Sequence, residues 1–315
     1  SARSMSDVES LVQALLAGNR RALGRILTRI EDDTPAGRRA LAMLYPRSGR
    51  AHTIGLTGSA GSGKSTLTGA LARELRRRGR TLGIVAIDPT SPFSHGALLG
   101  DRIRMQDLTS DPAIFLRSMA TRGALGGLAP STAGVVTALD AYGKDIVLVE
   151  TVGAGQDEVE IAMMADTTVV VVTPGFGDDV QAMKAGIMEI ADILVVNKSD
   201  LPNADLLERQ LRSILEGART ERVTPIVRTA GALNEGIDKL ADALEEHRTY
   251  ITSSGVREQH RREQARHQVL ALARQRLIER VVLAHGTDGR LDDVVEQVAA
   301  RKVDPHAAAE LLIGD

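Results

Sequence analysis

The sequence predicts an α/β fold built on a mostly parallel, doubly wound sheet. Short apolar runs alternate with longer helical patterns along the middle of the chain. Apolar runs without period-2 alternation are typical of strands covered on both faces, and their alternation with helices implies right-handed crossovers between parallel strands. The runs lie at 54–57, 82–87, 146–149, 168–173, 193–196 and 225–228, and the helical patterns at 64–78, 131–142, 180–190, 203–217 and 235–250.

Helical segments flank this α/β region on both sides. Three helical patterns precede it, and a long Arg-, Gln- and Glu-rich pattern at 257–284 follows it. That pattern carries one apolar face, which packs either on its own domain or, as an arm, on another subunit. Its apolar residues are Val269, Leu270, Ala273, Leu277 and Val281. We expect an N-terminal helical segment at 5–48, an α/β domain at 49–252 and a C-terminal helical region at 253–315.

Composition narrows the class of protein. The formal net charge of -2 gives no strong field for nucleic acid or an anionic membrane, so we expect neither as a partner. The chain contains no Cys, which agrees with a reducing compartment and removes thiolate metal sites. No window approaches the roughly 18 uninterrupted apolar residues of a membrane helix, and no signal peptide is evident. We expect a cytoplasmic protein.

A phosphate-binding loop joins the first apolar run to the next helical pattern. Gly58-x4-Gly63-Lys64-Ser65 follows a strand and opens a helix, which is the context that a P-loop NTPase requires. Glycines let successive backbone amides turn toward phosphate oxygens at the positive end of the helix. Lys64 should reach the β- and γ-phosphates, and the Ser65 hydroxyl should bind Mg²⁺. The loop candidates are Gly58, Ser59, Ala60, Gly61, Ser62 and Gly63.

A second motif selects guanine. Asn197-Lys198-Ser199-Asp200 follows the apolar run at 193–196, at a strand end where a base would lie. A carboxylate at Asp200 can accept hydrogen bonds from guanine N1–H and from the exocyclic amine, whereas adenine would leave it unpaired. Lys198 should lay its aliphatic stem over the base. The turn containing Ala230, Gly231 and Ala232 should supply a backbone amide to guanine O6.

Acidic residues follow other strands at the same predicted edge. Asp88 and Glu150 each end an apolar run, and Asp101 lies in a loop that could close over the γ-phosphate. Mg²⁺ that bridges phosphates takes one or two carboxylates and several waters. The backbone amide of Gly153 could contact the γ-phosphate, which would make 151–158 a nucleotide-sensing switch. Gln156 lies three places after Gly153 rather than beside it, so the water-orienting residue is not identified.

The combination of "GSAGSGKST", "DPTSPFSHGALLGDRIRM", "ETVGAGQDE", "GDDVQAMKAGIMEIAD" and "NKSD" resembles the methylmalonyl-CoA mutase-associated GTPases over roughly residues 5–300. The resemblance implies a homodimeric G protein that uses GTP or GDP with Mg²⁺ and binds a cobalamin-dependent acyl-CoA mutase. Such a protein gates adenosylcobalamin delivery by an adenosyltransferase and protects the mutase. The family's dimers use C-terminal helices, which favours a dimerisation arm at 257–284.

The resemblance also assigns roles to matching residues. Lys64, Ser65 and Thr66 would bind phosphates, and Asn197 and Asp200 would read guanine. Ser65, Asp88, Asp101 and Glu150 would serve Mg²⁺ and its waters, and the catalytic set would be Lys64, Asp101 and Glu150. Gln181 and Lys184 match a third switch that responds to the partner. Gln156 belongs to the nucleotide-sensing switch at 151–158.

The chemistry predicts GTP hydrolysis that is slow alone, on the order of 10⁻⁴ to 10⁻² s⁻¹, and faster with a partner. Two other functions share this fold. A nickel metallochaperone GTPase should show a Cys/His ligand cluster, and a kinase for arginine or ornithine should have an acceptor pocket with a base. The sequence names neither the mutase nor the nucleotide state that favours the complex.

Overall fold

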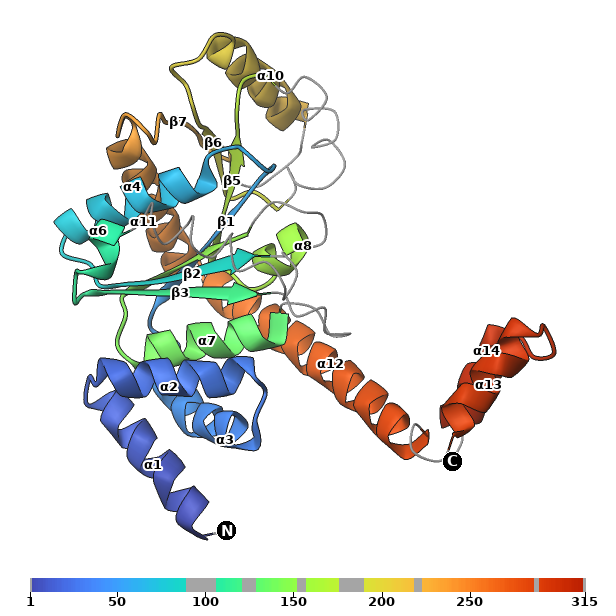
Figure 1. Cartoon of the computed structure of the whole chain (residues 1–315). Coiled ribbons are helices and arrows are strands. Elements are labelled where there is room, and N and C mark those ends of the chain that lie inside the picture. The colour runs from blue at the N-terminus through green and yellow to red at the C-terminus, as the bar shows by residue number, and fades with distance from the viewer. Residues whose placement is uncertain are drawn as a thin grey trace. The chain divides into compact units, whose positions relative to one another are not determined.

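The structure is a seven-stranded parallel sheet with helices on both faces (Figure 1). It is a computed structural model that describes residues 2–88, 106–120, 129–151, 157–175, 190–217, 223–285 and 289–313. The predicted α/β fold is confirmed. The strands are β1 (His52–Thr57), β2 (Leu82–Asp88), β3 (Ile114–Ala120), β4 (Ile146–Glu150), β5 (Thr167–Val172), β6 (Ile193–Val196) and β7 (Ile226–Arg228).

β1 lies at the point in the sheet where the strand order reverses. The order is β3-β2-β4-β1-β5-β6-β7, and every pairing is parallel. The carboxyl ends of all seven strands therefore meet at one edge. In open parallel sheets, ligands bind in the crevice beyond that edge where the strand order reverses.

Three hydrophobic clusters hold helices against the sheet. On one face, α4 (Lys64–Arg77), α6 (Gln106–Thr109) and α11 (Ile237–Ser253) pack on the strands. The other face is covered by α7 (Ala129–Ala141) and α8 (Asp157–Ala162) over one half and by α10 (Ala204–Gly217) over β5 and β6. Isoleucine, leucine and valine pointing both ways from each strand explain why the runs are apolar throughout rather than alternating.

The N-terminal helices form an outer layer on α7. These are α1 (Ala2–Leu16), α2 (Arg20–Glu31) and α3 (Pro35–Leu44), with a 3₁₀ turn η1 at Tyr45–Arg47. The Asn19 side chain caps α2 and the Thr34 side chain caps α3, as the first turn of a helix requires. Arg117 of β3 donates to both oxygens of Glu31 at 2.6 Å, so the layer is tied to the edge strand as well as to α7.

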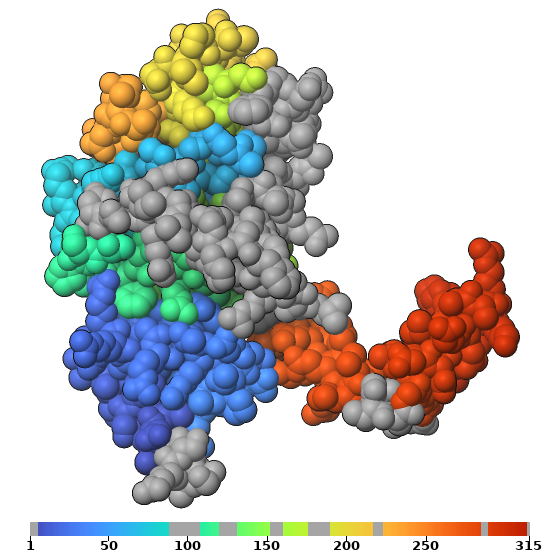
Figure 2. All heavy atoms as spheres, viewed as in Figure 1, coloured from blue at the N-terminus to red at the C-terminus, as the bar shows by residue number. Residues whose placement is uncertain are grey.

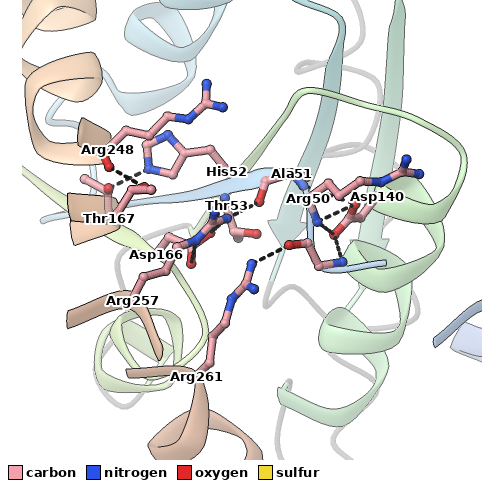
Figure 3. Close-up of polar contacts among 12 residues, drawn as sticks. Arg50, Ala51, His52, Thr53, Asp140, Asp166, Thr167, Arg248, Arg257 and Arg261 are labelled. Atoms are coloured by element: carbon pink, nitrogen blue, oxygen red, sulfur yellow. Dashed lines mark hydrogen bonds and ion pairs between the residues drawn. The ribbon is translucent and has the colours of Figure 1, made fainter. Parts of the chain in front are cut away.

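The amino-terminal edge of the sheet is closed by buried polar groups (Figure 3). The Asp140 carboxylate, 7% exposed, accepts hydrogen bonds from the backbone amides of Gly49, Arg50 and Ala51 at 2.6, 3.2 and 3.1 Å. The Thr167 hydroxyl lies 2.7 Å from His52 Nε2 and 2.7 Å from His247 Nδ1. Burial lowers the pKa of His52 to about 4, despite the nearby Asp166 carboxylate.

The C-terminal helices are α12 (Val256–His285), α13 (Arg290–Ala299) and α14 (Pro305–Ile313). Contacts divide the chain into two compact units, Ser1–Gln264 and Ala265–Asp315. Within the second unit, α13 packs on α14 and Arg290 donates to the Leu311 carbonyl at 2.8 Å. Along the described ranges, no helix combines the length and the apolar character needed to cross a membrane.

Candidate nucleotide-binding site

The loop between β1 and α4 requires glycine at both ends. Gly58 has φ +136° and Gly63 has φ +85°, a region that L side chains rarely adopt. Space is also lacking. A Cβ on Gly58 would lie 2.1 Å from the Val171 carbonyl oxygen, and one on Gly63 would lie 2.7 Å from Asn197 Nδ2. The loop is thus pressed against β5 on one side and against the segment after β6 on the other.

The first turn of α4 has no side-chain cap. Gly63 is the N-cap residue and provides no side-chain hydrogen bond, unlike Asn19 and Thr34 at α2 and α3. The opening backbone amides of α4 therefore need an acceptor from elsewhere. A phosphate group at this position would accept from them at the positive end of the helix macrodipole.

Lys64 is held inside the loop. Its side chain is 5% exposed, and Nζ donates to the carbonyls of Gly58 at 2.7 Å and Ser59 at 2.8 Å. An ammonium group carries three donors, so these bonds aim its charge at the space that the loop encloses. This is the placement from which a lysine can reach the β- and γ-phosphates of a nucleotide.

Ser65 and Glu150 bring two hard oxygen ligands together. Glu150 ends β4, which pairs with β1, and Ser65 Oγ donates to Glu150 Oε1 at 2.5 Å. A hydroxyl and a carboxylate beside a phosphate loop fit Mg²⁺, which prefers such ligands. Asp88 is the last residue of β2, but its side chain and all of Asp101 lie outside the described residues. Among the described side chains, His, Asp and Glu form no group of three that could hold a metal.

Asn197 joins the phosphate loop to the turn after β7. Its amide nitrogen donates to the Ser62 carbonyl at 2.8 Å. Its amide oxygen accepts from the Thr229 hydroxyl at 3.0 Å and from the Gly231 backbone amide at 3.2 Å. The side chain is 2% exposed. Asn197 therefore holds the loop at Ser62 and the turn at 229–231 at a fixed separation.

Lys198 lies along the phosphate loop. It adopts φ +55°, and its Nζ donates to the Gly61 carbonyl at 2.9 Å. Figure 2 shows the light-blue atoms at the start of α4 beside the yellow atoms of the segment after β6. Asp200 follows, exposed, two residues later. Lys198 and Asp200 thus follow β6 at the same edge of the sheet as the phosphate loop.

The structure brings together the described part of the predicted site at the carboxyl edge of the sheet. Five predicted residues fall outside the described ranges, and their roles stay predictions. They are Asp101, Gly153, Gln156, Gln181 and Lys184. The site-residue assignments as a whole rest on motif and position.

The side chains of two threonines at this edge had no role in the sequence prediction. The buried Thr229 hydroxyl bonds Asn197, and Thr173, 6% exposed, directly follows β5 with a hydroxyl that makes no hydrogen bond to the described residues. A polar residue directly after an apolar strand is the signal that could have found both. The signal is weak alone, because many strands end in polar turns.

The comparisons with known proteins agree with this geometry. The family model described as "Methylmalonyl Co-A mutase-associated GTPase MeaB" matches residues 23–286. A Pyrococcus abyssi protein named for GTPase activity is 43% identical, covering 97% of this chain and 96% of its own length. A Caenorhabditis elegans protein named "Methylmalonic aciduria type A homolog, mitochondrial" is 31% identical, covering 98% and 82%.

A solved structure shares the fold. The crystal structure described as "LAO/AO transport system kinase" superposes with a TM-score of 0.74 at 24% identity and covers 98% of this chain and 96% of that one. At this identity the likeness shows the fold alone. It adds a second, independent support for the α/β arrangement of strands and helices.

Proposed function

Since the chain belongs to the family of methylmalonyl Co-A mutase-associated GTPases, we propose that it binds and hydrolyses GTP as the chaperone of a cobalamin-dependent acyl-CoA mutase. Methylmalonyl-CoA mutase is the first candidate partner, in agreement with the family description and the name of the Caenorhabditis elegans relative. In this role it gates cofactor loading, with an adenosyltransferase as the second partner, and protects the mutase from inactivation. The observation that carries the proposal is the assembly of Lys64, Ser65 and Glu150 beside an uncapped helix.

The residues of the phosphate loop supply binding and charge compensation. The α4 amides and Lys64 bind the phosphates. Thr66, in the first turn of α4, is assigned to the same phosphates. Ser65 and Glu150, with Asp88 and Asp101, are the residues that would hold Mg²⁺. A bound Mg²⁺ ion would neutralise charge on the β- and γ-phosphates. Phosphoryl transfer to water depends on such positioning more than on covalent chemistry.

Guanine recognition is assigned to Asp200, Lys198 and the turn at 230–232. Within that turn the amide of Ala230 already donates to the Glu235 carbonyl at 3.0 Å, and that of Gly231 donates to Asn197. The Ala232 amide makes no hydrogen bond to the described residues. We therefore assign the contact with guanine O6 to Ala232.

Replacing Asp200 by Asn tests the assignment of the base. Asp200→Asn should lower affinity for GTP on the order of a hundredfold, because an amide cannot accept two hydrogen bonds from guanine. The same variant should gain affinity for xanthosine triphosphate, whose 2-oxo group accepts from the new amide. Titration calorimetry with both nucleotides measures the exchange. Asp238→Asn, an exposed acid on α11, serves as the control, and equal losses for both nucleotides contradict the assignment.

Partner sensing is assigned to three segments, 94–105, 151–158 and 177–188. Each contains residues outside the described ranges, so this part rests on motif match. Hydrolysis should accelerate when the mutase orders them. Capture of the mutase from native extract, with GDP and with a non-hydrolysable GTP analogue, tests the partner. Turnover of the isolated chain as fast as that of the complex contradicts the proposal.

Homodimer formation through the C-terminal region is part of the proposal. On the described residues of α12, apolar side chains that should form one helix face are exposed: Val269 64%, Leu270 59% and Leu277 61%. Exposed apolar area of this kind on a helix favours burial against a second copy. Sedimentation measures the oligomeric state of the full chain and of a Leu270→Glu and Leu277→Glu double variant.

The two other functions lack support among the described residues. A nickel chaperone needs a cluster of Cys and His, and the chain has no Cys. A kinase for arginine or ornithine would phosphorylate its amino acid, so an assay for that product separates it from hydrolysis. We also propose the division into three parts at 5–48, 49–252 and 253–315 and a cytoplasmic location.

A further inference from the structure

Three side chains on the first turns of α12 bind backbone and carboxylate groups of the sheet. We call them the root of α12: Arg257, Arg261 and Gln264. Arg257 donates to the Ala51 carbonyl at 2.8 Å, and Arg261 donates to the Gly49 carbonyl at 2.6 Å (Figure 3). The spacing of four and three residues places all three on one helix face. The root thus fixes the start of α12 to the segment before β1.

Arg257 also neutralises a buried acid. Its guanidinium nitrogens Nε and Nη2 lie 3.3 Å from the two oxygens of Asp166, whose residue is 8% exposed. Asp166 Oδ2 accepts from the Thr53 backbone amide at 3.0 Å, and the Asp166 amide donates to the Thr53 carbonyl at 2.8 Å. Without Arg257 this buried carboxylate would lose its ion-pair partner among the described residues. Breaking such a pair from one side is costly.

Asp166 lies four residues after Ala162, the last residue of α8. The backbone amides of Met164 and Ala165 both bond the Ile161 carbonyl, at 3.0 and 2.9 Å. The root also holds Ala165, whose carbonyl accepts from Gln264 at 2.9 Å. Five residues, 152–156, join the start of α8 to Thr151, which follows Glu150. One short segment therefore runs from the predicted nucleotide-sensing switch to the root.

There is no free space between this segment and β1. A Cβ placed on Gly55 would lie 2.3 Å from Ile161 Cγ2 and 3.2 Å from the Ala165 Cβ. Ile161 is buried. Close-packed contacts of this kind transmit displacement instead of absorbing it. A shift of α8 along β1 must therefore move Ala165 and Asp166, which the root holds.

We propose that Arg257 is a positioning residue for GTP hydrolysis, acting through Asp166 and Ala165 on α8. By holding the chain just after α8, Arg257 fixes the position of a helix that only five residues join to Thr151 and Glu150, beside the phosphate loop. The inference rests on the GTPase function proposed above.

The test compares two ion pairs that each tie a helix to the sheet. Arg257→Ala in the full chain should lower single-turnover hydrolysis at saturating GTP about tenfold and leave the Kd for GDP within twofold. Arg257→Lys, which keeps the charge beside Asp166, should recover most of that loss. Arg117→Ala, which breaks the pair with Glu31 at 2.6 Å, should reduce thermal stability but leave hydrolysis within twofold. A merely structural role for Arg257 would make the Arg257→Ala and Arg117→Ala variants alike.

Several results overturn the inference. They are an unchanged or increased rate in Arg257→Ala, a parallel loss of GDP affinity, or an equal loss of rate in Arg117→Ala. If the unmodified chain binds GTP without hydrolysing it, the proposed function fails, and amide hydrogen exchange over 157–166 decides the inference. Exchange there should differ between GDP and a non-hydrolysable GTP analogue in the unmodified chain and should not differ in Arg257→Ala. Identical exchange in both nucleotide states of the unmodified chain contradicts the inference.

Discussion

The two ends of β1 handle polar groups in opposite ways. At its carboxyl end the chain turns into a glycine loop whose helix amides have no side-chain cap and whose carbonyls are bonded by Lys64 and Lys198. At its amino end the Asp140 carboxylate accepts from the backbone amides of residues 49–51, and the Asp166 carboxylate accepts from that of Thr53. Among the described residues, the first amides of α4 at the carboxyl end have no side-chain acceptor, whereas the amides of residues 49–51 and 53 at the amino end are already paired with carboxylates.

The difference lies in which partners can be replaced. Lysine bonds to carbonyl oxygens at the carboxyl end are interactions that a nucleotide's phosphates can outcompete, because a charged acceptor binds an ammonium more strongly than a neutral one. At the amino end, the three backbone amides that donate to Asp140 have each used their one hydrogen and have no donor left for a ligand. One strand therefore supports a binding site at one end and a fixed anchor at the other.

The largest expected effect falls on the carboxyl end. Lys64→Ala should weaken GTP binding on the order of a thousandfold, about 4 kcal/mol, because the phosphates lose their buried cation. Unfolding of the nucleotide-free protein by urea should change by less than about 1 kcal/mol. Calorimetry and urea titration measure the two quantities. Lys239→Ala, an exposed lysine on α11, is the control and should alter neither.

The next effect concerns the anchor. Asp140→Ala should destabilise the protein by roughly 3 kcal/mol, because three amides lose their acceptor. At a temperature where the variant is folded, its affinity for GDP should match that of the unmodified chain. Asp242→Ala removes an exposed acid that pairs with Arg78 and should cost less than about 1 kcal/mol. A large loss of GDP affinity in Asp140→Ala would contradict the separation of the two ends.

The smallest effect is a pH dependence of the unfolding free energy, which arises from His52 at the amino end of β1. The folded pKa of His52, about 4, lies below its unfolded value of about 6.5, so between these values the unfolded chain binds a proton that the folded chain excludes. The stabilisation is complete above the unfolded pKa and is lost as pH falls. Unfolding free energy should therefore decrease by about 2 kcal/mol from pH 7 to pH 5 through this residue.

Urea titrations at the two pH values measure this decrease. His52→Gln retains a donor for Thr167 and cannot titrate, so its own decrease over the same interval should be smaller by that amount. If both chains lose equal stability, His52 is not the group responsible. Titratable groups that do not interact with His52 contribute equally to both chains and cancel.

The sequence predicts the central strands because both of their faces are buried. Runs such as 146–149 and 193–196 are apolar at every position, and this identifies them without knowledge of their neighbours. β3 was missed because Arg117 and Ser118 interrupt its apolar residues. β3 is the edge strand, and the reason for a charge within it lies 86 residues away, at Glu31 on α2. The six-residue α8 was also missed, since it is shorter than a pattern of helical period can reveal.

The candidate site divides in the same way. The phosphate loop is a local motif whose residues are adjacent, so spacing alone identifies it. The contacts of Asn197 join three segments, and they become visible only once β6 and β7 lie beside β1. Sequence assigns Asn197 to the base, and the structure adds its bond to Ser62. Arg257 belongs to no sequence motif. Its partners Ala51 and Asp166 lie more than 90 residues away, so no local pattern could have identified it.

The root of α12 also determines where a shortened version of the protein can end. Pattern and composition mark Ser253 to Gly255 as a linker, which would suggest stopping there. A fragment ending at Gly255 would strand the Asp166 carboxylate in a dry environment and leave the carbonyls of Gly49, Ala51 and Ala165 without their donors. A fragment ending just beyond Gln264 retains every one of these bonds, so it must include about two and a half turns of α12.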